Sequence, residues 1–453
     1  MTVSSPFKAY DIRGQIDVNI DEDFARRLGR AAAHVTGAKV AVVGGDARAT
    51  SAPYSAALAQ GLAEAGLEVH DLRLCGTEEV YFGTAHLKAD IGIMVTASHN
   101  PIGDNGFKLV GPGAAPLDDA TFRAIESATL AGEGSTASEA GNIHRADIRA
   151  DYVERVLSFV DVGALPEISL AVNAGNGAAG PTFDAIAAAL EAKGARLTIT
   201  RVHHDPDASF PNGIPNPLLP QNHAATAGPV LNANAALGVA WDGDFDRCFF
   251  FDETGAFVAG EYVVGLLAQA TLSQLEGAKI IHDPRVQWNT QARVTAMGGD
   301  AVVSRTGHAL IKAKMREVDG AYGGEMSAHH YFRDFMYCDS GMIPWLLVLA
   351  WMGKTGQSLS SLVAEMRDAF PSSGEMNFRV ADAQALLAQM ETTYSPEARD
   401  VDHLDGLSVS YPDWRFNLRC SNTEPLVRLN VETKGDAALL EAKVAELRGQ
   451  IEG

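Results

Sequence analysis

A serine beside a histidine stands at the end of an apolar run and could act as a nucleophile. Ser98 and His99 belong to residues 96–101, Thr-Ala-Ser-His-Asn-Pro, which follow the apolar residues 90–95. The run is typical of a buried strand and the glycines after it predict a loop, so Ser98 is expected at a strand's C-terminal end. Open α/β sheets bind ligands at that end. A Ser-His pair is also common in ordinary turns, so its meaning depends on other residues.

An acidic triplet follows a second apolar strand, residues 237–241. Its members are Asp242, Asp244 and Asp246. In a loop bent by Gly243 the carboxylates can converge, and they then repel one another unless a cation neutralises them. Carboxylate oxygens suit Mg²⁺, and the spacing lacks the glycine and glutamate of an EF-hand. Arg247, directly after the triplet, is suited to phosphate. A solvated acidic turn is the alternative.

A third polar segment lies between two predicted strands near the C-terminus. Residues 419–425 read Arg-Cys-Ser-Asn-Thr-Glu-Pro, and Arg428 follows in the next strand. The Arg419 guanidinium, the Ser421 and Thr423 hydroxyls and the Asn422 amide, with backbone N–H groups, fit a phosphate. A structural Ser-Asn-Thr turn is the alternative.

The glycine-hinged loop at residues 323–329 carries polar side chains at alternate positions. Glu325 can accept hydrogen bonds, while Ser327 and His329 can donate or accept them. Such a set could bind vicinal sugar hydroxyls, although on this motif alone an ordinary loop is favoured. Further polar residues at predicted loops or strand ends are Tyr10, Arg13, Lys108, Arg285 and His308, none of them diagnostic singly.

The elements that would position these residues follow a recurring strand-helix-strand pattern. Its first copy has a strand at 39–43, a helix opened by Pro53 and closed by Gly66, and a strand at 67–72. The second copy has a strand at 169–172, a helix between Pro181 and Gly194, and a strand at 195–201. A looser third copy runs through 279–283, 288–297 and 301–305. The proline and glycine positions are typical helix punctuation, and the pattern favours duplicated α/β domains.

Length and composition bound the classes of protein that fit. At 453 residues, the chain should hold about three or four domains of ~100–150 residues. A net charge of −21 argues against nucleic acid and anionic membranes as partners. No apolar run approaches the ~20 residues needed to span a bilayer, and the N-terminus does not resemble a signal peptide. The four scattered cysteines disfavour zinc sites and disulfides and fit the cytoplasm.

Taken together, the motifs resemble those of the α-D-phosphohexomutases, in particular the bacterial phosphomannomutase/phosphoglucomutase family. The resemblance covers almost the whole chain and rests on five motifs in the family's order. These are Tyr10-Asp-Ile-Arg-Gly14, Thr96–Pro101, Asp242–Arg247, Gly324–His329 and Arg419–Thr423. It implies three related mixed-sheet βα domains and a smaller C-terminal α+β domain around one cleft. The expected boundaries are 1–145, 146–254, 255–370 and 371–453.

The resemblance also implies roles for individual residues. Ser98 corresponds to the residue phosphorylated in the active enzyme, and Asp242, Asp244 and Asp246, with an oxygen at Ser98, correspond to the Mg²⁺ ligands. The set near the transferred phosphoryl is Arg13, His99, Lys108 and Arg247. The set that binds sugar hydroxyls is Glu325, Ser327 and His329. The set for the non-transferred phosphate and further substrate contacts is Arg419, Ser421, Asn422, Thr423, Arg285, His308, Tyr10 and Arg428.

The implied reaction is the interconversion of hexose 6-phosphate and hexose 1-phosphate, of mannose, glucose or both. Phosphoserine 98 would donate its phosphoryl to the sugar, and the hexose 1,6-bisphosphate would turn and return its other phosphoryl. Lys108 or His99 could take the acceptor's proton. The alternatives are a Mg²⁺-dependent sugar phosphatase with a phosphoserine intermediate, a phosphoglucosamine mutase and a non-catalytic sugar-phosphate sensor. A monomer is expected, with a dimer as the alternative.

One segment departs from the family's pattern. Residues 44–48 read Gly-Gly-Asp-Ala-Arg, where many relatives have Arg before the Asp and Gly after it. We expect a local change near the rim of the cleft and unchanged chemistry.

Overall fold

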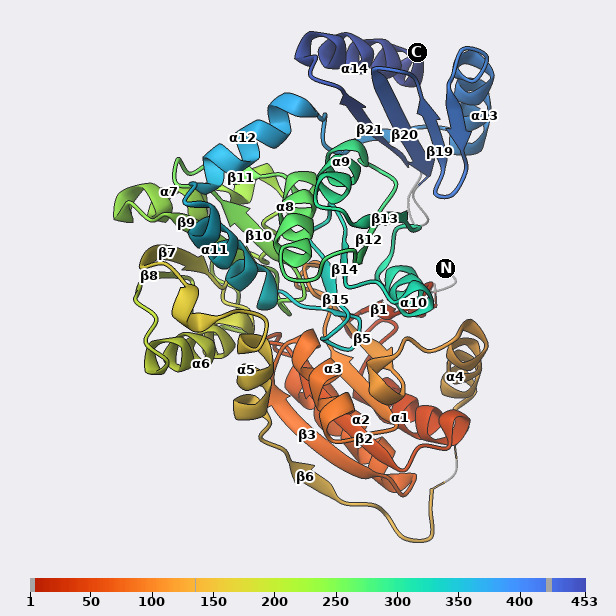
Figure 1. Cartoon of the computed structure of the whole chain (residues 1–453). Coiled ribbons are helices and arrows are strands. Elements are labelled where there is room, and N and C mark those ends of the chain that lie inside the picture. The colour runs from red at the N-terminus through yellow and green to blue at the C-terminus, as the bar shows by residue number, and fades with distance from the viewer. Residues whose placement is uncertain (1–4, 135, 421–425) are drawn as a thin grey trace. The chain divides into compact units, whose positions relative to one another are not determined.

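The chain forms two compact units in the computed structural model, which describes residues 5–134, 136–420 and 426–453. Unit 1 comprises Met1–Phe257 and His329–Thr355, and unit 2 comprises Val258–Ala328 and Gly356–Gly453. Figure 1 traces the elements along the chain.

The first part of unit 1 is a mixed sheet with strand order β1-β5-β4-β2-β3-β6. Its elements are β1 (Ile12–Gln15), α1 (Glu22–Thr36), β2 (Val40–Gly45), α2 (Ser51–Glu64), β3 (Glu68–Leu74), α3 (Thr77–His86), β4 (Ile91–Val95), β5 (Asp104–Val110), α4 (Asp119–Ala131) and β6 (Ile143–Arg145). Strands β2 and β4 are parallel neighbours, so their C-terminal ends share one edge of the sheet. The segments that follow, which begin at Asp46 and Thr96, therefore leave the sheet side by side.

Burial and capping explain why these elements form. Every residue of β4 is buried, as a central strand covered on both faces requires. Helices α2 and α3 pack against β2 (Figure 1). Helix α1 begins after Asp21, which accepts a hydrogen bond from the Phe24 N–H, and ends at Gly37 in the left-handed conformation.

The second part of unit 1 repeats the α/β arrangement in a sheet of order β11-β10-β9-β7-β8. Its elements are α5 (Arg149–Leu157), β7 (Ile168–Asn173), α6 (Ala179–Ala192), β8 (Leu197–Val202), α7 (Ala224–Ala233), β9 (Leu237–Trp241), β10 (Cys248–Phe251) and β11 (Phe257–Val258). The antiparallel pair β15 (His330–Phe332) and β16 (Cys338–Asp339) and helix α11 (Ile343–Thr355) complete the unit. Strand β9 is wholly buried and ends directly before Asp242.

Unit 2 combines a parallel arrangement with a separate antiparallel sheet. Its first elements are α8 (Gly260–Leu272), β12 (Lys279–His282), α9 (Trp288–Ala296), β13 (Asp300–Val303), α10 (His308–Val318), β14 (Tyr322–Gly324) and α12 (Leu359–Ala369). Strand β12 pairs in parallel with both β13 and β14. The later elements are β17 (Met376–Arg379), α13 (Ala383–Tyr394), β18 (Asp400–Asp402), β19 (Leu407–Ser410), β20 (Trp414–Cys420), β21 (Leu426–Thr433) and α14 (Ala437–Glu452). The C-terminal sheet has the order β17-β21-β20-β19-β18.

The predicted fold class, mixed α/β sheets followed by an α+β region, is confirmed, and two local predictions are wrong. Helices α2 and α6 begin at Ser51 and Ala179, so Pro53 and Pro181 are third rather than first residues. Proline is tolerated there because the first turn's N–H groups have no partner within the helix. Residues 104–110 are strand β5 rather than the end of a glycine-rich turn, and β5 pairs antiparallel with both β1 and β4.

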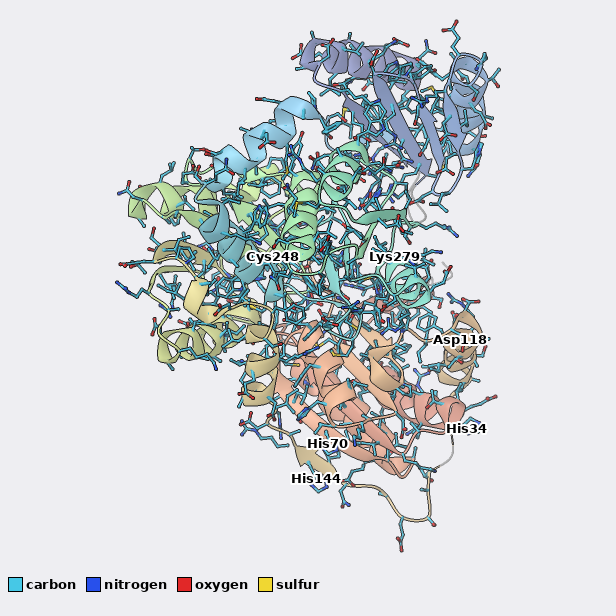
Figure 2. The ribbon with its side chains drawn as sticks, in the orientation of Figure 1. His34, His70, Asp118, His144, Cys248 and Lys279 are labelled. Carbon is cyan, nitrogen blue, oxygen red and sulfur yellow. The ribbon has the colours of Figure 1, made fainter. Side chains whose placement is uncertain are left out.

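The cysteines do not pair, in agreement with the prediction from their spacing. Cys75, Cys248 and Cys338 are buried free thiols and Cys420 is half-buried; Figure 2 labels Cys248 in β10. Within the described ranges, no helix has both the length and the apolar character that crossing a bilayer requires.

Candidate active site

Ser98 lies on a tight loop directly after β4, as the sequence predicts. It is 1 % exposed and has a φ of +50°, a left-handed conformation that costs free energy for a residue with a Cβ. The Ser98 N–H donates to the Thr96 hydroxyl at 2.8 Å. A backbone held in such a conformation needs support from its surroundings.

Arg48 provides much of that support. Its two terminal nitrogens donate to four carbonyl oxygens of the loop: Ser98 at 2.9 Å, Asn100 at 2.6 Å, and Pro101 and Asp104 at 3.0 Å each. Because Arg48 is 4 % exposed, the interpretation of this segment as a cleft rim is wrong. It lies in the interior, against the serine loop.

Asp46 extends the same network from the end of β2. Its carboxylate accepts from the Thr96 hydroxyl at 2.7 Å and from the Ser51 hydroxyl at 2.5 Å, and it pairs with Arg48 at 3.6 Å. Burial raises the pKa of Asp46 despite these partners. Sequence reasoning treated the pair only as a departure from a pattern, because neither residue has a periodic signal.

We expect Arg48→Met to lower the free energy of unfolding by about 3 kcal/mol, because it leaves several carbonyls unsatisfied and Asp46 without its ion pair. Urea unfolding measures this change. Arg48→Lys, which keeps the charge but loses the planar fork, should fall between Arg48→Met and the wild type. A loss below about 0.5 kcal/mol for Arg48→Met would show that the loop does not depend on this side chain.

The acidic loop after β9 converges as expected, but Gly243 does not bend it. The left-handed residue is Phe245, with a φ of +44°, and its side chain is fully buried. Gly243 is needed for space, because a Cβ there would lie 2.6 Å from the Ser98 carbonyl oxygen. The two loops therefore touch through their backbones, and the Ser98 hydroxyl donates to an Asp242 carboxylate oxygen at 2.7 Å.

Lys108 and Thr77 neutralise and orient the buried acids. The Lys108 ammonium donates to Asp244 at 2.7 Å and also to Asp246, and the Thr77 hydroxyl donates to Asp244 at 2.5 Å. Burial raises the pKa of Asp242, and the charge of Asp246 raises it further. Burial also opposes ionisation of Asp246, but Lys108 and other nearby cations hold its pKa well below the usual range. Lys108 thus pairs with two of the three carboxylates, and Arg247 lies 3.7 Å from the third, Asp242.

The three aspartates fit a divalent cation. One oxygen of each carboxylate, Oδ1 in every case, is buried without a hydrogen-bond partner among the described residues. Oxygens of the three acids lie within 4.8 Å of one another. Buried, unsatisfied carboxylate oxygens are costly unless a cation binds them, and hard oxygen ligands suit Mg²⁺. Asp246 also belongs to a group with His329 and Asp339 that could hold a metal.

Two further predicted residues of unit 1, His99 and Arg13, lie near Ser98 and the acids. His99 Nδ1 lies 2.9 Å from the Ser98 hydroxyl oxygen. Burial, together with the charges of Arg247 and Arg13, lowers the pKa of His99 well below its usual value. Arg13 pairs with Asp11 at 2.9 Å. The lowered pKa of His99 keeps its imidazole neutral and also makes it a weaker base than a free histidine.

His329 contacts the acidic loop. The Arg247 Nε–H donates to His329 Nε2 at 3.2 Å, and that nitrogen lies 3.6 Å from an Asp246 oxygen. Tyr10, by contrast, is an exposed side chain.

A second set of predicted residues gathers in unit 2 around Arg285. Asp283 accepts from the Arg285 guanidinium at 2.7 Å, and the Ser327 hydroxyl lies 3.5 Å from the same nitrogen. Glu325, 3.9 Å from Arg285, accepts from the Gly307 N–H at 3.0 Å. His308 is the first residue of α10. The set offers acceptors and donors together, as a polyhydroxyl ligand requires.

Arg419 and Arg428 come from neighbouring strands β20 and β21, and both contact a residue that sequence reasoning missed. Glu375 lies 2.8 Å from Arg419, 3.4 Å from Arg428 and 3.4 Å from Arg285. Ser421, Asn422 and Thr423 lie outside the described residues. Glu375 gave no signal because a single glutamate before a strand is unremarkable in sequence.

Comparisons with known proteins cover all parts of the chain. The descriptions that match are phosphoglucomutase/phosphomannomutase alpha/beta/alpha domains I, II and III, over residues 4–135, 150–255 and 259–370, and the C-terminal domain of the same group, over 375–450. A phosphomannomutase of Salmonella typhimurium is 53% identical, with 99% of each chain covered. Phosphohexose mutases of Xanthomonas campestris are 51% identical, again over 99% of each chain. A solved phosphoglucomutase/phosphomannomutase family protein of Burkholderia thailandensis is 31% identical, covering 99% of this chain and 97% of that one, with a TM-score of 0.87.

Proposed function

The chain belongs to the phosphoglucomutase/phosphomannomutase family, and from this premise we propose that it interconverts hexose 6-phosphate and hexose 1-phosphate through phosphoserine 98. It is an isomerase of the intramolecular phosphotransferase type. The observation that carries the proposal is the contact between the Ser98 hydroxyl and Asp242, at 2.7 Å, beside two further buried carboxylates. A hydroxyl against an acidic triplet is suited to holding and transferring a phosphoryl group.

Transfer begins when the bond between phosphorus and the Ser98 oxygen breaks and a bond to the free sugar hydroxyl forms. The hydroxyl's proton passes to a base, and the product is a hexose 1,6-bisphosphate. After the bisphosphate turns, its other phosphoryl returns to Ser98. Arg13, Lys108 and Arg247 stabilise the charge on the transferring oxygens by position and electrostatics.

Asp242, Asp244 and Asp246, with an oxygen at Ser98, would hold Mg²⁺. When bound, Mg²⁺ would neutralise charge that develops on the phosphoryl oxygens. The unsatisfied Oδ1 atoms of the aspartates support this assignment.

Of the two candidate bases, His99 and Lys108, we assign His99 to the step in which Ser98 accepts a phosphoryl group; for this step the Ser98 hydroxyl must turn its proton from Asp242 to His99. The neutral imidazole is 2.9 Å from the Ser98 hydroxyl oxygen. Burial lowers the pKa of Lys108, but the charges of Asp244 and Asp246 outweigh that effect and raise it above its usual value. Lys108 therefore remains a cation and acts by its charge.

A second group of residues, most of them in unit 2, binds the sugar and the phosphate that is not transferred. Glu325 and Ser327, with His329, contact hydroxyls that glucose and mannose share, so both sugars are substrates. Arg419, with Ser421, Asn422 and Thr423, binds the non-transferred phosphate. The further substrate contacts are Tyr10, Arg285, His308 and Arg428. The ring of donors and acceptors around Arg285 supports these roles.

The domain boundaries 1–145, 146–254, 255–370 and 371–453 form part of the same proposal. The family descriptions, which begin and end within ten residues of them, support these boundaries. The protein acts on hexose phosphates as a cytoplasmic monomer.

A side-by-side mutase assay tests the proposal. The purified protein is supplied with Mg²⁺, a trace of glucose 1,6-bisphosphate, and the phosphates of mannose, glucose and glucosamine. We expect isomerisation of the mannose and glucose phosphates and little of glucosamine phosphate. Release of inorganic phosphate without isomerisation would favour the phosphatase, and preference for glucosamine phosphate would favour the phosphoglucosamine mutase. Binding without turnover would favour a sensor.

A further inference from the structure

Glu375 occupies the centre of a cluster of arginines, all within unit 2. One carboxylate oxygen lies 2.8 Å from Arg419 and 3.4 Å from Arg285, and the other lies 3.4 Å from Arg428. The Glu375 side chain is 21 % exposed, whereas that of Arg285 is 3 % exposed. An anion from solution can therefore approach the carboxylate, while the guanidinium of Arg285 is held in place by the protein.

The strand pairing favours an anion at this point. Arg419 of β20 and Arg428 of β21 are direct cross-strand partners. Like charges directly opposite each other destabilise an antiparallel pair unless a counter-charge lies between them. Glu375 immediately precedes β17, which pairs with β21. This position brings the Glu375 carboxylate close to Arg419 and Arg428. Burial opposes ionisation, but Arg285 and Arg419 lower the pKa of Glu375, so it is charged.

The carboxylate does not use all the donors that the cluster offers. The Nε–H groups of Arg285 and Arg419 are buried without an acceptor among the residues that the structure describes. A carboxylate has two oxygens, whereas a phosphate has three free oxygens and up to two charges, so phosphate can use more of these donors. A phosphate would therefore match the donors of this cluster better than the Glu375 carboxylate does.

We propose that Glu375 is a built-in competitor for the phosphate that is not transferred: its carboxylate holds the arginines together when no ligand is bound, and the substrate's phosphate must displace it. The proposal rests on the function assigned to Arg419 above. Competition lowers the affinity for phosphate and speeds its release. A reaction in which a bisphosphate must leave this site, turn and bind again by its other end requires such release.

The test is the affinity of the full-length protein for inorganic phosphate, measured by calorimetry, together with the kinetics of the mutase reaction. We expect Glu375→Gln to bind phosphate about three- to tenfold more tightly, because a repelling charge is lost. The KM for hexose phosphate should fall by a similar factor, and kcat should fall with it as release slows. Glu375→Asp, which keeps the charge, should stay within about twofold of the wild type.

Two further variants make the result specific. Glu365→Gln removes the same charge from a different ion pair of unit 2, in which Glu365 lies 2.8 Å from Arg293. This variant should leave phosphate affinity unchanged. Arg419→Ala should weaken phosphate binding, which places the measured binding at this cluster. Unchanged or weaker phosphate binding by Glu375→Gln overturns the proposal, because the carboxylate would then only position the arginines.

The two proposals can fail separately. If the wild type isomerises no hexose phosphate but Glu375→Gln still binds phosphate more tightly, the mutase assignment is wrong and the proposal that Glu375 competes with phosphate is supported. If the wild type is an active mutase and Glu375→Gln shows no gain in phosphate affinity, the proposal that Glu375 competes with phosphate is wrong and the mutase assignment is supported.

Discussion

Ser98→Ala is expected to reduce mutase turnover by at least about 10⁴-fold while hexose phosphate binding remains measurable, because loss of a covalent nucleophile removes the reaction path rather than the binding site. The structure makes the serine hard to replace. Its hydroxyl lies 2.7 Å from Asp242 and 2.9 Å from His99, and its backbone is held in a left-handed conformation. The measurements are steady-state turnover and transfer of label from radioactive glucose 1,6-bisphosphate to the protein, which the variant should not show.

Ser55→Ala is the matched control for this experiment. Ser55 is also a buried serine of unit 1, and its hydroxyl has no hydrogen-bond partner among the described residues, so the variant should fold and retain full turnover. Activity of Ser98→Ala within tenfold of the wild type, or labelling of its protein chain, would eliminate phosphoserine 98 as the carrier.

The positions of the two chemical loops could be predicted because each follows an uninterrupted apolar run. Strands β4 and β9 are buried along their whole length, and such runs are visible in sequence. The residue types in the loops that follow, a serine beside a histidine after β4 and three aspartates after β9, then indicate what chemistry each loop could perform. The contact between Ser98 and Asp242, 144 positions apart, could only be expected from the family resemblance. No local signal encodes a distance of that kind.

Strand β5 was missed because its pairing is non-local and its sequence contains glycine. Asp104–Val110 begins Asp-Asn-Gly, which favours a turn. Pairing with β1 and β4 on both sides overrides that preference. This matters for the site, because the Lys108 side chain reaches Asp244 from a strand that is paired on both sides.

Arg48 and Glu375 show a second limit of sequence reasoning. Both are single charged residues, and such residues usually lie on the surface. Arg48 is instead buried against the serine loop, and Glu375 is enclosed by three arginines. Their roles depend on which backbone carbonyls or cations lie near them in the folded chain. The spacing of residues in the sequence does not reveal these neighbours. Arg285, Arg419 and Arg428 form a local concentration of positive charge in a chain whose net charge is −21.

Asp244→Asn is expected to abolish the stabilisation of the protein by Mg²⁺ and to lower turnover by about 10²- to 10³-fold, an effect comparable to removing one electrostatic stabiliser of a transition state. A ligand that binds only the folded state raises the melting temperature with its concentration. Thermal unfolding with increasing Mg²⁺ therefore measures the site independently of activity. Without Mg²⁺ the variant should be at least as stable as the wild type, because one of three mutually repelling buried charges is gone and Lys108 can still pair with Asp246.

Asp119→Asn removes the same charge from an exposed side chain at the start of α4, so it should keep the wild-type response to Mg²⁺. This control separates binding at the triplet from weak attraction of the cation to an acidic protein. An unaltered Mg²⁺ response in Asp244→Asn would mean that the acids serve only to bind Lys108. In that case the variant should also lose stability without Mg²⁺, because Lys108 would lose its 2.7 Å contact with a carboxylate. The loss of this ion pair would then outweigh the relief of repulsion among the three aspartates. The direction of the change in the metal-free protein therefore distinguishes a cation site from a buried salt bridge.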